Sequence, residues 1–215
     1  MSSLLDQSGF DRWAGSYDES IGNNPTGYPF EGYYRVLEFV RRQLGESVRN
    51  LRILDLGIGT GLLTQRLYDE GAAIVGLDFS AEMLRQAEEK MPSGEFLLHD
   101  LTKPLPRRIT EDSFDFVVSS YAVHHLLLVR LVELILESLP LLCVGGKLLF
   151  ADVGFLSQSD LNHCRRQNES HWDDAENYLV AEELLKGLRH SGTEVNARYT
   201  QLSSCAGVLT VLSTK

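Results

Sequence analysis

The sequence predicts an α/β fold: a three-layer α/β/α sandwich around a seven-stranded, mostly parallel sheet with a late antiparallel hairpin. From residue 51 onward, short apolar segments alternate with longer segments of helical period, which is the pattern of β-α-β units. A glycine-rich turn over residues 57–61 directly follows the first apolar segment. The length of 215 residues suits one domain, so we expect residues 1–215 to fold as a single domain.

The first half of the predicted core contains three strands, over residues 51–56, 73–77 and 95–98. A helix over residues 61–70 lies between the first two strands, and Gly71 is its expected C-cap. Ser80 is the expected N-cap of a second helix. That helix ends near Met91, because Pro92 disfavours helical geometry in the residue before it.

The second half of the core contains a helix over residues 123–139, in which Arg130, Glu133 and Glu137 share one outward face. A glycine pair at 145–146 then turns the chain into the next strand. The last two strands are joined as a hairpin, which completes the sheet. The strands predicted in this half cover residues 114–119, 147–153, 194–199 and 208–212.

Apolar residues three and four positions apart predict two amphipathic helices ahead of the sheet. We therefore expect a helical cap or lid over 1–45, a core over 51–153, an insertion or cap over 154–190 and a terminal hairpin over 193–213. The flexible joint Gly22-Asn23-Asn24-Pro25 between the two helices suits a lid that closes over a site. The helix-forming residues are Phe10, Trp13 and Tyr17, and then Tyr33, Val36, Leu37 and Val40.

The charge balance disfavours a nucleic-acid partner. Asp plus Glu number 30 against 20 Lys plus Arg, which gives a net charge of −10, and no basic block is present. The cysteines, Cys143, Cys164 and Cys205, have no C-x-x-C spacing, so we expect reduced thiols rather than disulfides or a zinc finger. The sequence shows no export signal and no membrane span, so we expect a cytoplasmic protein whose oligomeric state stays open.

A strand that runs directly into glycines at alternate positions indicates a ligand site. Glycine permits positive φ and removes the Cβ atom, so a ligand can approach the backbone at the carboxyl end of the strand. Asp55, Asp78 and Asp100 lie at or beside the carboxyl ends of the first three strands. Such strand ends bind ligands in open α/β sheets. Asp78 follows the glycine turn by about twenty residues, the spacing at which a carboxylate accepts hydrogen bonds from a ribose.

Two cofactor classes fit this arrangement, a dinucleotide and S-adenosylmethionine (AdoMet), and the glycine spacing separates them. A dinucleotide fingerprint, G-x-G-x-x-G, needs glycine at the position that Leu62 occupies. Here an acidic residue precedes the turn, and the glycines are Gly57, Gly59 and Gly61.

The segments D-L-G-I-G-T-G, D-F-S, H-D-L and F-D-F-V-V-S-S-Y-A-V-H-H together resemble class I AdoMet-dependent methyltransferases over residues 53–152. The opening F-D-R-W-A-G-S-Y-D is similar to the N-terminal segment of small bacterial methyltransferases with ubiquinone-methylase-like cores. The resemblance implies a Rossmann-like fold, AdoMet as cofactor and residues 51–153 as the cofactor-binding core.

Position by position, the resemblance implies that Gly57 and Gly59 pass beside the cofactor and that Asp55 lies near its amino group. It also implies that Asp78 binds the ribose and that Asp100 accepts a hydrogen bond from the adenine amine.

The same resemblance implies that Phe79 and Leu101 sandwich the adenine and that the Ser119 backbone contacts the methionine part. Tyr17 is similar to the lid tyrosine of such enzymes, and a core aromatic on a helix face is the alternative.

Methyl transfer from a sulfonium is a direct displacement, so alignment of the reactants is the main task of the protein. A general base is needed only where the acceptor loses a proton, and His124 and His125 are the candidates, because they follow the fourth strand. We expect no metal, since His163, Cys164 and His171 lack the usual ligand spacing.

We expect a small-molecule methyl acceptor, neutral or cationic, in a pocket that the cap segments build. Aromatic residues in these segments, including Tyr28, Phe30, Tyr33 and Trp172, suit either a planar pocket or the core. The alternatives are a protein or RNA methyltransferase and a non-catalytic AdoMet-binding regulatory subunit. The sequence does not name the acceptor atom, because the fold fixes the cofactor and leaves acceptor choice to variable segments.

Overall fold

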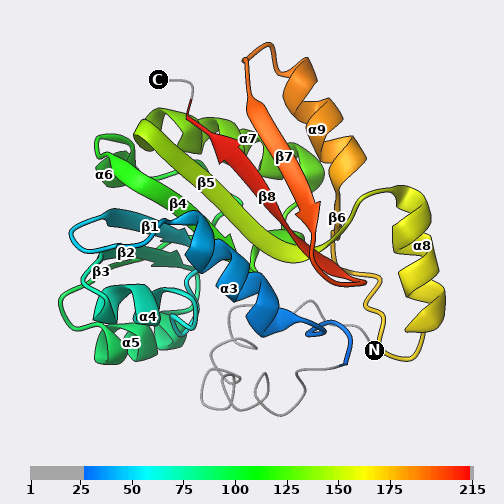
Figure 1. The fold of residues 1–215 in the computed structure, drawn as a ribbon, viewed down its shortest axis with the longest axis horizontal. Helices are drawn as coiled ribbons and strands as arrows, with labels where there is room; N and C mark the ends of the chain where they lie inside the picture. Colours follow the sequence, from blue (N-terminus) through cyan, green and yellow to red (C-terminus); the bar gives the residue numbers. More distant parts are fainter. Residues whose placement is uncertain (1–26, 214–215) are drawn as a thin grey trace.

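The computed structural model describes residues 27–213 (Figure 1). The predicted helix with Phe10, Trp13 and Tyr17, and the joint over residues 22–25, lie outside the described residues.

One twisted sheet forms the centre of the molecule, with seven strands in the order β3-β2-β1-β4-β5-β8-β7. Strands β1 to β5 pair in parallel, whereas β8 is antiparallel to both β5 and β7, which confirms the predicted mostly parallel sheet and late hairpin. A two-residue strand, β6 (Leu179–Val180), pairs with the end of β5 and was not predicted. The others are β1 (Arg52–Leu56), β2 (Ala73–Asp78), β3 (Glu95–Leu98), β4 (Phe114–Ser120), β5 (Leu142–Phe155), β7 (Asn196–Gln201) and β8 (Ala206–Leu212).

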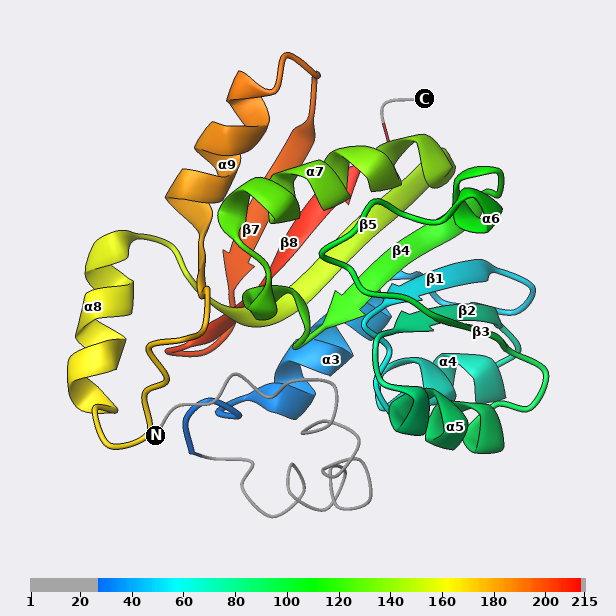
Figure 2. The ribbon, with the colours of Figure 1, turned by 180° about the vertical axis from the view of Figure 1, so that it is seen from behind.

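Helices cover both faces of the sheet and give the predicted three layers (Figures 1 and 2). Each face has its own buried apolar cluster, which explains why the central strands β1, β4 and β5 are mostly apolar on both sides. One layer contains α3 (Tyr33–Gln43), α4 (Thr64–Asp69) and α5 (Ala81–Lys90). The other contains α6 (Arg107–Thr110), α7 (Leu128–Ser138) and α9 (Ala181–His190), and α8 (Gln158–Gln167) lies beside the end of β5.

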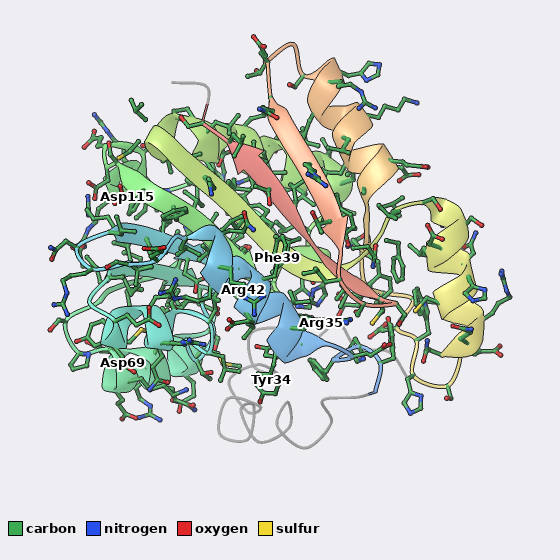
Figure 3. The ribbon with its side chains drawn as sticks, viewed as in Figure 1. Tyr34, Arg35, Phe39, Arg42, Asp69 and Asp115 are labelled. Atoms are coloured by element: carbon green, nitrogen blue, oxygen red, sulfur yellow. The ribbon has the colours of Figure 1, made fainter. Side chains whose placement is uncertain are left out.

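The amphipathic pattern over residues 33–40 forms α3 as predicted. Tyr33, Val36 and Val40 are buried against the sheet. Tyr34 and Arg42 project from the opposite side of the helix (Figure 3). Ser80 is the N-cap of α5 as predicted, and its hydroxyl accepts the Met83 backbone N–H at 3.2 Å. None of the helices within residues 27–213 has the length and apolar character needed to cross a bilayer.

The single helix predicted over residues 123–139 is wrong. The chain forms a 3₁₀ turn over Val123–His125, becomes extended at Leu126 and enters α7 only at Leu128. The buried Asp152 carboxylate causes the break, because its Oδ2 accepts the backbone N–H groups of Val123 at 2.8 Å and His124 at 3.0 Å.

The outward face predicted for Arg130 is also wrong. Its side chain is about one-tenth exposed and forms a two-point ion pair with Glu137. The guanidinium also donates to the backbone carbonyls of Leu101 at 2.9 Å and Lys103 at 2.8 Å. A charged side chain that satisfies two carbonyls and a carboxylate is stable in a buried position.

Two other element boundaries differ from the prediction. The helix expected over residues 61–70 begins only at Thr64, since the glycine turn extends further than expected. Strand β5 begins at Leu142, ahead of the glycine pair, and a register shift against β4 accommodates the glycines within the strand. In the predicted insertion over 154–190, α9 contacts α7 and β7, so this part joins a helical layer. The cap and lid roles of these segments stay predictions.

Candidate active site

A cavity opens at the carboxyl ends of β1 to β4, where the order of the strands reverses direction between β1 and β4. Ligands of open α/β sheets bind at this type of position. The loop after each of the four strands contributes to the wall. The wall contains two aspartates and one Tyr33 ring from α3, and none of the described residues that line it is a lysine or arginine.

The glycine turn forms the part of the wall next to β1. The N–H groups of Gly57 and Ile58 both donate to the Leu77 carbonyl, at 2.8 and 3.0 Å, which ties the turn to β2. Gly57 and Gly59 have φ values of 77° and 55°, in the left-handed region that favours glycine. A Cβ at Gly57 would collide with the Ala122 side chain, whereas a Cβ at Gly59 would meet nothing within 4 Å.

Asp78 connects the end of β2 to this turn. Its Oδ2 accepts the Gly59 N–H at 2.8 Å, and its Oδ1 accepts the Ser80 N–H at 2.9 Å. Burial raises the pKa of Asp78, although the hydrogen bonds from Ser80 and Gly59 oppose this rise. Each carboxylate oxygen has a second lone pair, so Asp78 both holds the turn and can accept a ligand hydroxyl in the cavity.

Asp55 lies in β1, and only 1% of its surface is exposed. The Thr64 hydroxyl donates to its Oδ2 at 3.0 Å, while its Oδ1 has no hydrogen-bond partner among residues 27–213. Burial raises the pKa of Asp55 to about 7, against the opposing effect of the Thr64 hydrogen bond. A buried carboxylate oxygen without a donor suits a cationic or amine group of a ligand.

The loop after β3 supplies another part of the wall. Asp100 and Leu101 come from this loop, Phe79 directly follows β2, and all three line the cavity. Their contacts with an adenine stay a prediction. Burial would raise the pKa of Asp100, but hydrogen bonds from the Thr102 hydroxyl and N–H, at 2.7 and 2.8 Å, lower it overall. Arg130 holds the Leu101 carbonyl from behind, so this wall is fixed by α7.

Ser119 lies outside the residues that line the cavity. Its side chain is fully buried and its hydroxyl donates to the Leu56 carbonyl at 2.6 Å, so it joins β4 to β1. Ser120 and Tyr121 form this part of the wall instead, and Tyr121 adopts a φ of 51°. Tyr17 lies outside the described residues.

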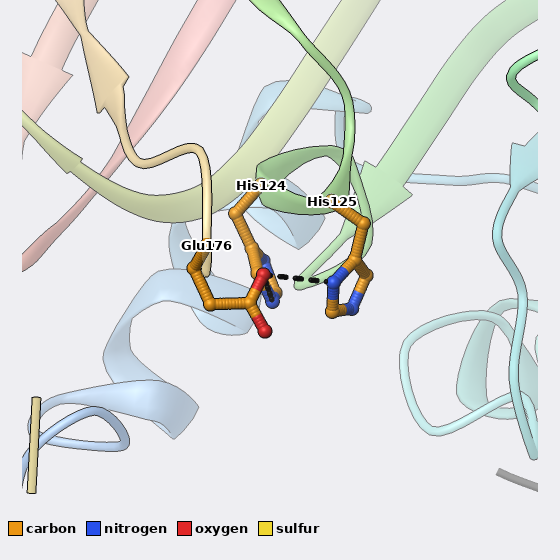
Figure 4. A group of neighbouring side chains, drawn as sticks. All are labelled: His124, His125 and Glu176. Carbon is orange, nitrogen blue, oxygen red and sulfur yellow. Dashed lines mark ion pairs between the residues drawn. The ribbon is translucent and has the colours of Figure 1, made fainter. Parts of the chain in front are cut away.

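His125 lines the cavity, and His124 lies beside it with its ring centroid 4.1 Å away. Burial would lower the pKa of His124, but the Asp152 carboxylate, 2.6 Å from Nδ1, raises it overall. Glu176 joins the pair from the loop before β6, with Oε2 2.9 Å from His125 Nδ1 (Figure 4). Sequence spacing did not indicate Asp152 or Glu176, since neither lies near the histidines along the chain.

Aromatic side chains bring the two predicted cap segments together. Tyr28 stacks on Trp172 with ring centroids 5.4 Å apart, and Trp172 packs against Tyr178 at 4.5 Å. Tyr33 packs against the cavity residue Tyr121 at 4.6 Å. The segment before α3 and the segment after α8 therefore meet on the side of the cavity where the histidines lie.

Comparisons with known proteins show the family of the chain. Residues 53–146 match the model of a family described as methyltransferase domain. A methyltransferase of uncharacterized activity from Geobacillus thermodenitrificans is 37% identical over 150 residues, which are 68% of this chain and 66% of that protein. Another from Geobacillus sp. (strain WCH70) is 30% identical over 211 residues, 93% of this chain and 94% of that one.

The fold also resembles solved structures. The crystal structure of magnesium protoporphyrin IX methyltransferase from Synechocystis PCC 6803 with bound SAH has a TM-score of 0.69 over 97% of this chain and all of that one. The TM-score shows a shared fold, and at 16% identity the likeness is one of fold alone. The sequence matches to the curated methyltransferases extend over more than two thirds of the chain. The chain therefore belongs to the class I AdoMet-dependent methyltransferases.

Proposed function

We propose that the protein transfers the methyl group of AdoMet to a small molecule, neutral or cationic, that enters beside His125. The observation that carries this proposal is the cavity wall, which contains Asp78 and Asp100 but, among the described residues, no lysine or arginine. Phosphorylated acceptors are usually bound by such cations, so this wall disfavours them. The net charge of −10 also disfavours polyanionic RNA.

The residues of the cavity fit AdoMet. The open space at Gly59 leaves room for a ligand to pass against the backbone. Asp55 lies outside the residues that line the cavity, but its Oδ1, which has no hydrogen-bond partner among residues 27–213, suits the amino group of the methionine part. Asp78 would accept the ribose hydroxyls, and Asp100 the adenine amine. The ring of Phe79 and the side chain of Leu101 would lie on either side of the adenine.

Two further roles that the resemblance implies are also part of the proposal. Ser119 would act only through the β4 backbone, since its hydroxyl already donates to Leu56. Tyr17 would close the site from the N-terminal segment, together with the aromatic cluster of Tyr28 and Trp172.

When bound, AdoMet supplies an electrophilic methyl carbon on a sulfonium. The chain then has to align the acceptor with that carbon and exclude water, which contributes up to about 7–11 kcal/mol to a rate enhancement. The glycine turn and Asp78 line the cavity together with Tyr33 and Tyr121, whose rings pack against one another and help to exclude water. His125, which lines the cavity next to His124, would take a proton from an acceptor that must lose one.

Incubation with methyl-labelled AdoMet and a fractionated cell extract tests the acceptor class. We expect the label in the small-molecule fraction, and label confined to RNA or to protein would contradict the proposal. A variant His125→Ala should lose turnover while it retains affinity for the demethylated product, S-adenosylhomocysteine (SAH).

A further inference from the structure

Two imidazole rings and one carboxylate meet beside the cavity (Figure 4). His124, His125 and Glu176 each offer one ligand atom, and these three atoms all lie within 4.8 Å of one another. The side chains are only 14%, 27% and 16% exposed, so the group is partly closed to solvent and open on one side.

The surrounding chain holds these three side chains in place. Asp152, itself 1% exposed, lies with Oδ1 2.6 Å from His124 Nδ1, which directs Nε2 of the same ring away from it and toward Glu176. The Oδ2 atom of Asp152 fixes the 3₁₀ turn that carries both histidines. The N–H of Asn177 donates to the His124 carbonyl at 2.8 Å, which ties the loop of Glu176 to the same turn. Metal-binding histidines usually donate their second ring nitrogen to a carboxylate in this way.

The Oε2 atom of Glu176 is buried beside both histidines. It lies 2.9 Å from His125 Nδ1 and 4.0 Å from His124 Nε2, yet no donor within residues 27–213 meets it with hydrogen-bond geometry. The ion pairs that the described residues form with Glu176 and Asp152 come from these two histidines. Backbone N–H groups of Val123 and His124 satisfy Asp152. Glu176 Oε2 lacks such a donor among the described residues, and a buried carboxylate oxygen without a donor is costly.

We propose that His124, His125 and Glu176 bind one divalent first-row transition-metal ion of the zinc class. Two imidazole nitrogens and one carboxylate form the ligand set of catalytic zinc sites, which keep a fourth position open. Because His125 lines the cavity, an ion bound by this group would lie beside the proposed active site.

This inference replaces the sequence-based expectation that the protein has no metal site, and its ligand set joins residues far apart in the chain. Ring nitrogens that bind a metal are not available as a base. The proton-accepting role proposed for His125 therefore belongs to the metal-free protein, and comparison of turnover with and without a chelator separates the two roles.

Calorimetric titration of untagged, metal-depleted protein with Zn²⁺, without AdoMet, tests the site. We expect one ion per chain, and visible absorption from a four- or five-coordinate ion when Co²⁺ replaces Zn²⁺. Glu176→Gln, which keeps the size of the side chain, and His125→Ala should each weaken Zn²⁺ binding at least 10-fold. Asp152→Asn should weaken it about 10- to 100-fold through the orientation of His124.

Matched controls are Glu169→Gln and His163→Ala, which change an exposed residue of the same type in the neighbouring segment and should leave Zn²⁺ affinity unchanged. SAH affinity and thermal unfolding of each variant show that the fold is intact. The proposal is wrong if Zn²⁺ does not bind, or if Glu176→Gln and His125→Ala bind it like the parent protein. Since the titration contains no AdoMet, failure of the acceptor proposal would leave its outcome unchanged.

Discussion

Alanine at the two glycines of the cavity turn should have different effects on stability. Both positions have positive φ, so alanine at either costs about 1–2 kcal/mol for the left-handed backbone. At Gly57 the new Cβ would also overlap the Ala122 side chain, and such overpacking costs about 1–3 kcal/mol more. At Gly59 the new Cβ meets open space, so only the backbone cost applies.

Gly57→Ala should therefore reduce the free energy of unfolding by about 2–5 kcal/mol and Gly59→Ala by about 1–2 kcal/mol. The Gly57→Ala variant should therefore be less stable than Gly59→Ala by about 1–3 kcal/mol. For a chain of this size, its Tm should then be about 2–12 °C below that of Gly59→Ala. Urea unfolding followed by circular dichroism measures both values. Gly59→Ala should weaken SAH binding in spite of its smaller effect on stability, because its methyl group enters the cavity.

Equal losses of stability in the two variants would refute the reasoning, since the contact between residue 57 and Ala122 would then carry no cost. Unchanged SAH affinity in Gly59→Ala would show that the ligand does not pass against this part of the turn.

Three further predictions follow from buried charged groups. Asp78→Asn should lower SAH affinity about 10- to 150-fold in calorimetry, because hydrogen bonds to a charged group contribute about 1.5–3 kcal/mol; an unchanged affinity would make Asp78 purely structural. Burial raises the pKa of Asp55 to about 7, so the folded state retains a proton that the unfolded chain loses above about pH 4. The free energy of unfolding should therefore fall as pH rises from about 4 to about 7, and Asp55→Asn should reduce this fall. The same pH dependence of unfolding in the parent protein and in Asp55→Asn would contradict this prediction. Arg130→Met should cost about 1–3 kcal/mol in urea unfolding, because it leaves two backbone carbonyls without their donor and Glu137 without its counter-charge, whereas the exposed control Arg107→Met should change little.

Local sequence signals predicted the elements whose causes are local. Apolar segments placed the seven strands of the main sheet, and Ser80 indicated the start of α5, because its hydroxyl caps a backbone N–H three residues away. The glycines of the turn at 57–61 indicated the cavity, since their need for positive φ is a property of the residues themselves.

Features that depend on distant contacts were not predictable from the sequence. The helix expected from residue 123 is broken by Asp152, which lies 28 residues after His124. The helical repeat puts Arg130 at an outward position, yet a loop 29 residues earlier in the chain places the Leu101 carbonyl against its side chain. Glu176 joins the histidines only because the loop before β6 folds back to the turn, through the bond from Asn177 to His124. A single sequence contains no local signal for such pairs.

Calorimetry with AdoMet, SAH and NADH tests the central claim most directly, since the cavity at the ends of β1 to β4 is assigned to one cofactor. The account predicts that AdoMet and SAH each bind at one site per chain and compete with one another, and that NADH does not bind. Binding of NADH in the absence of any binding of AdoMet or SAH would contradict it.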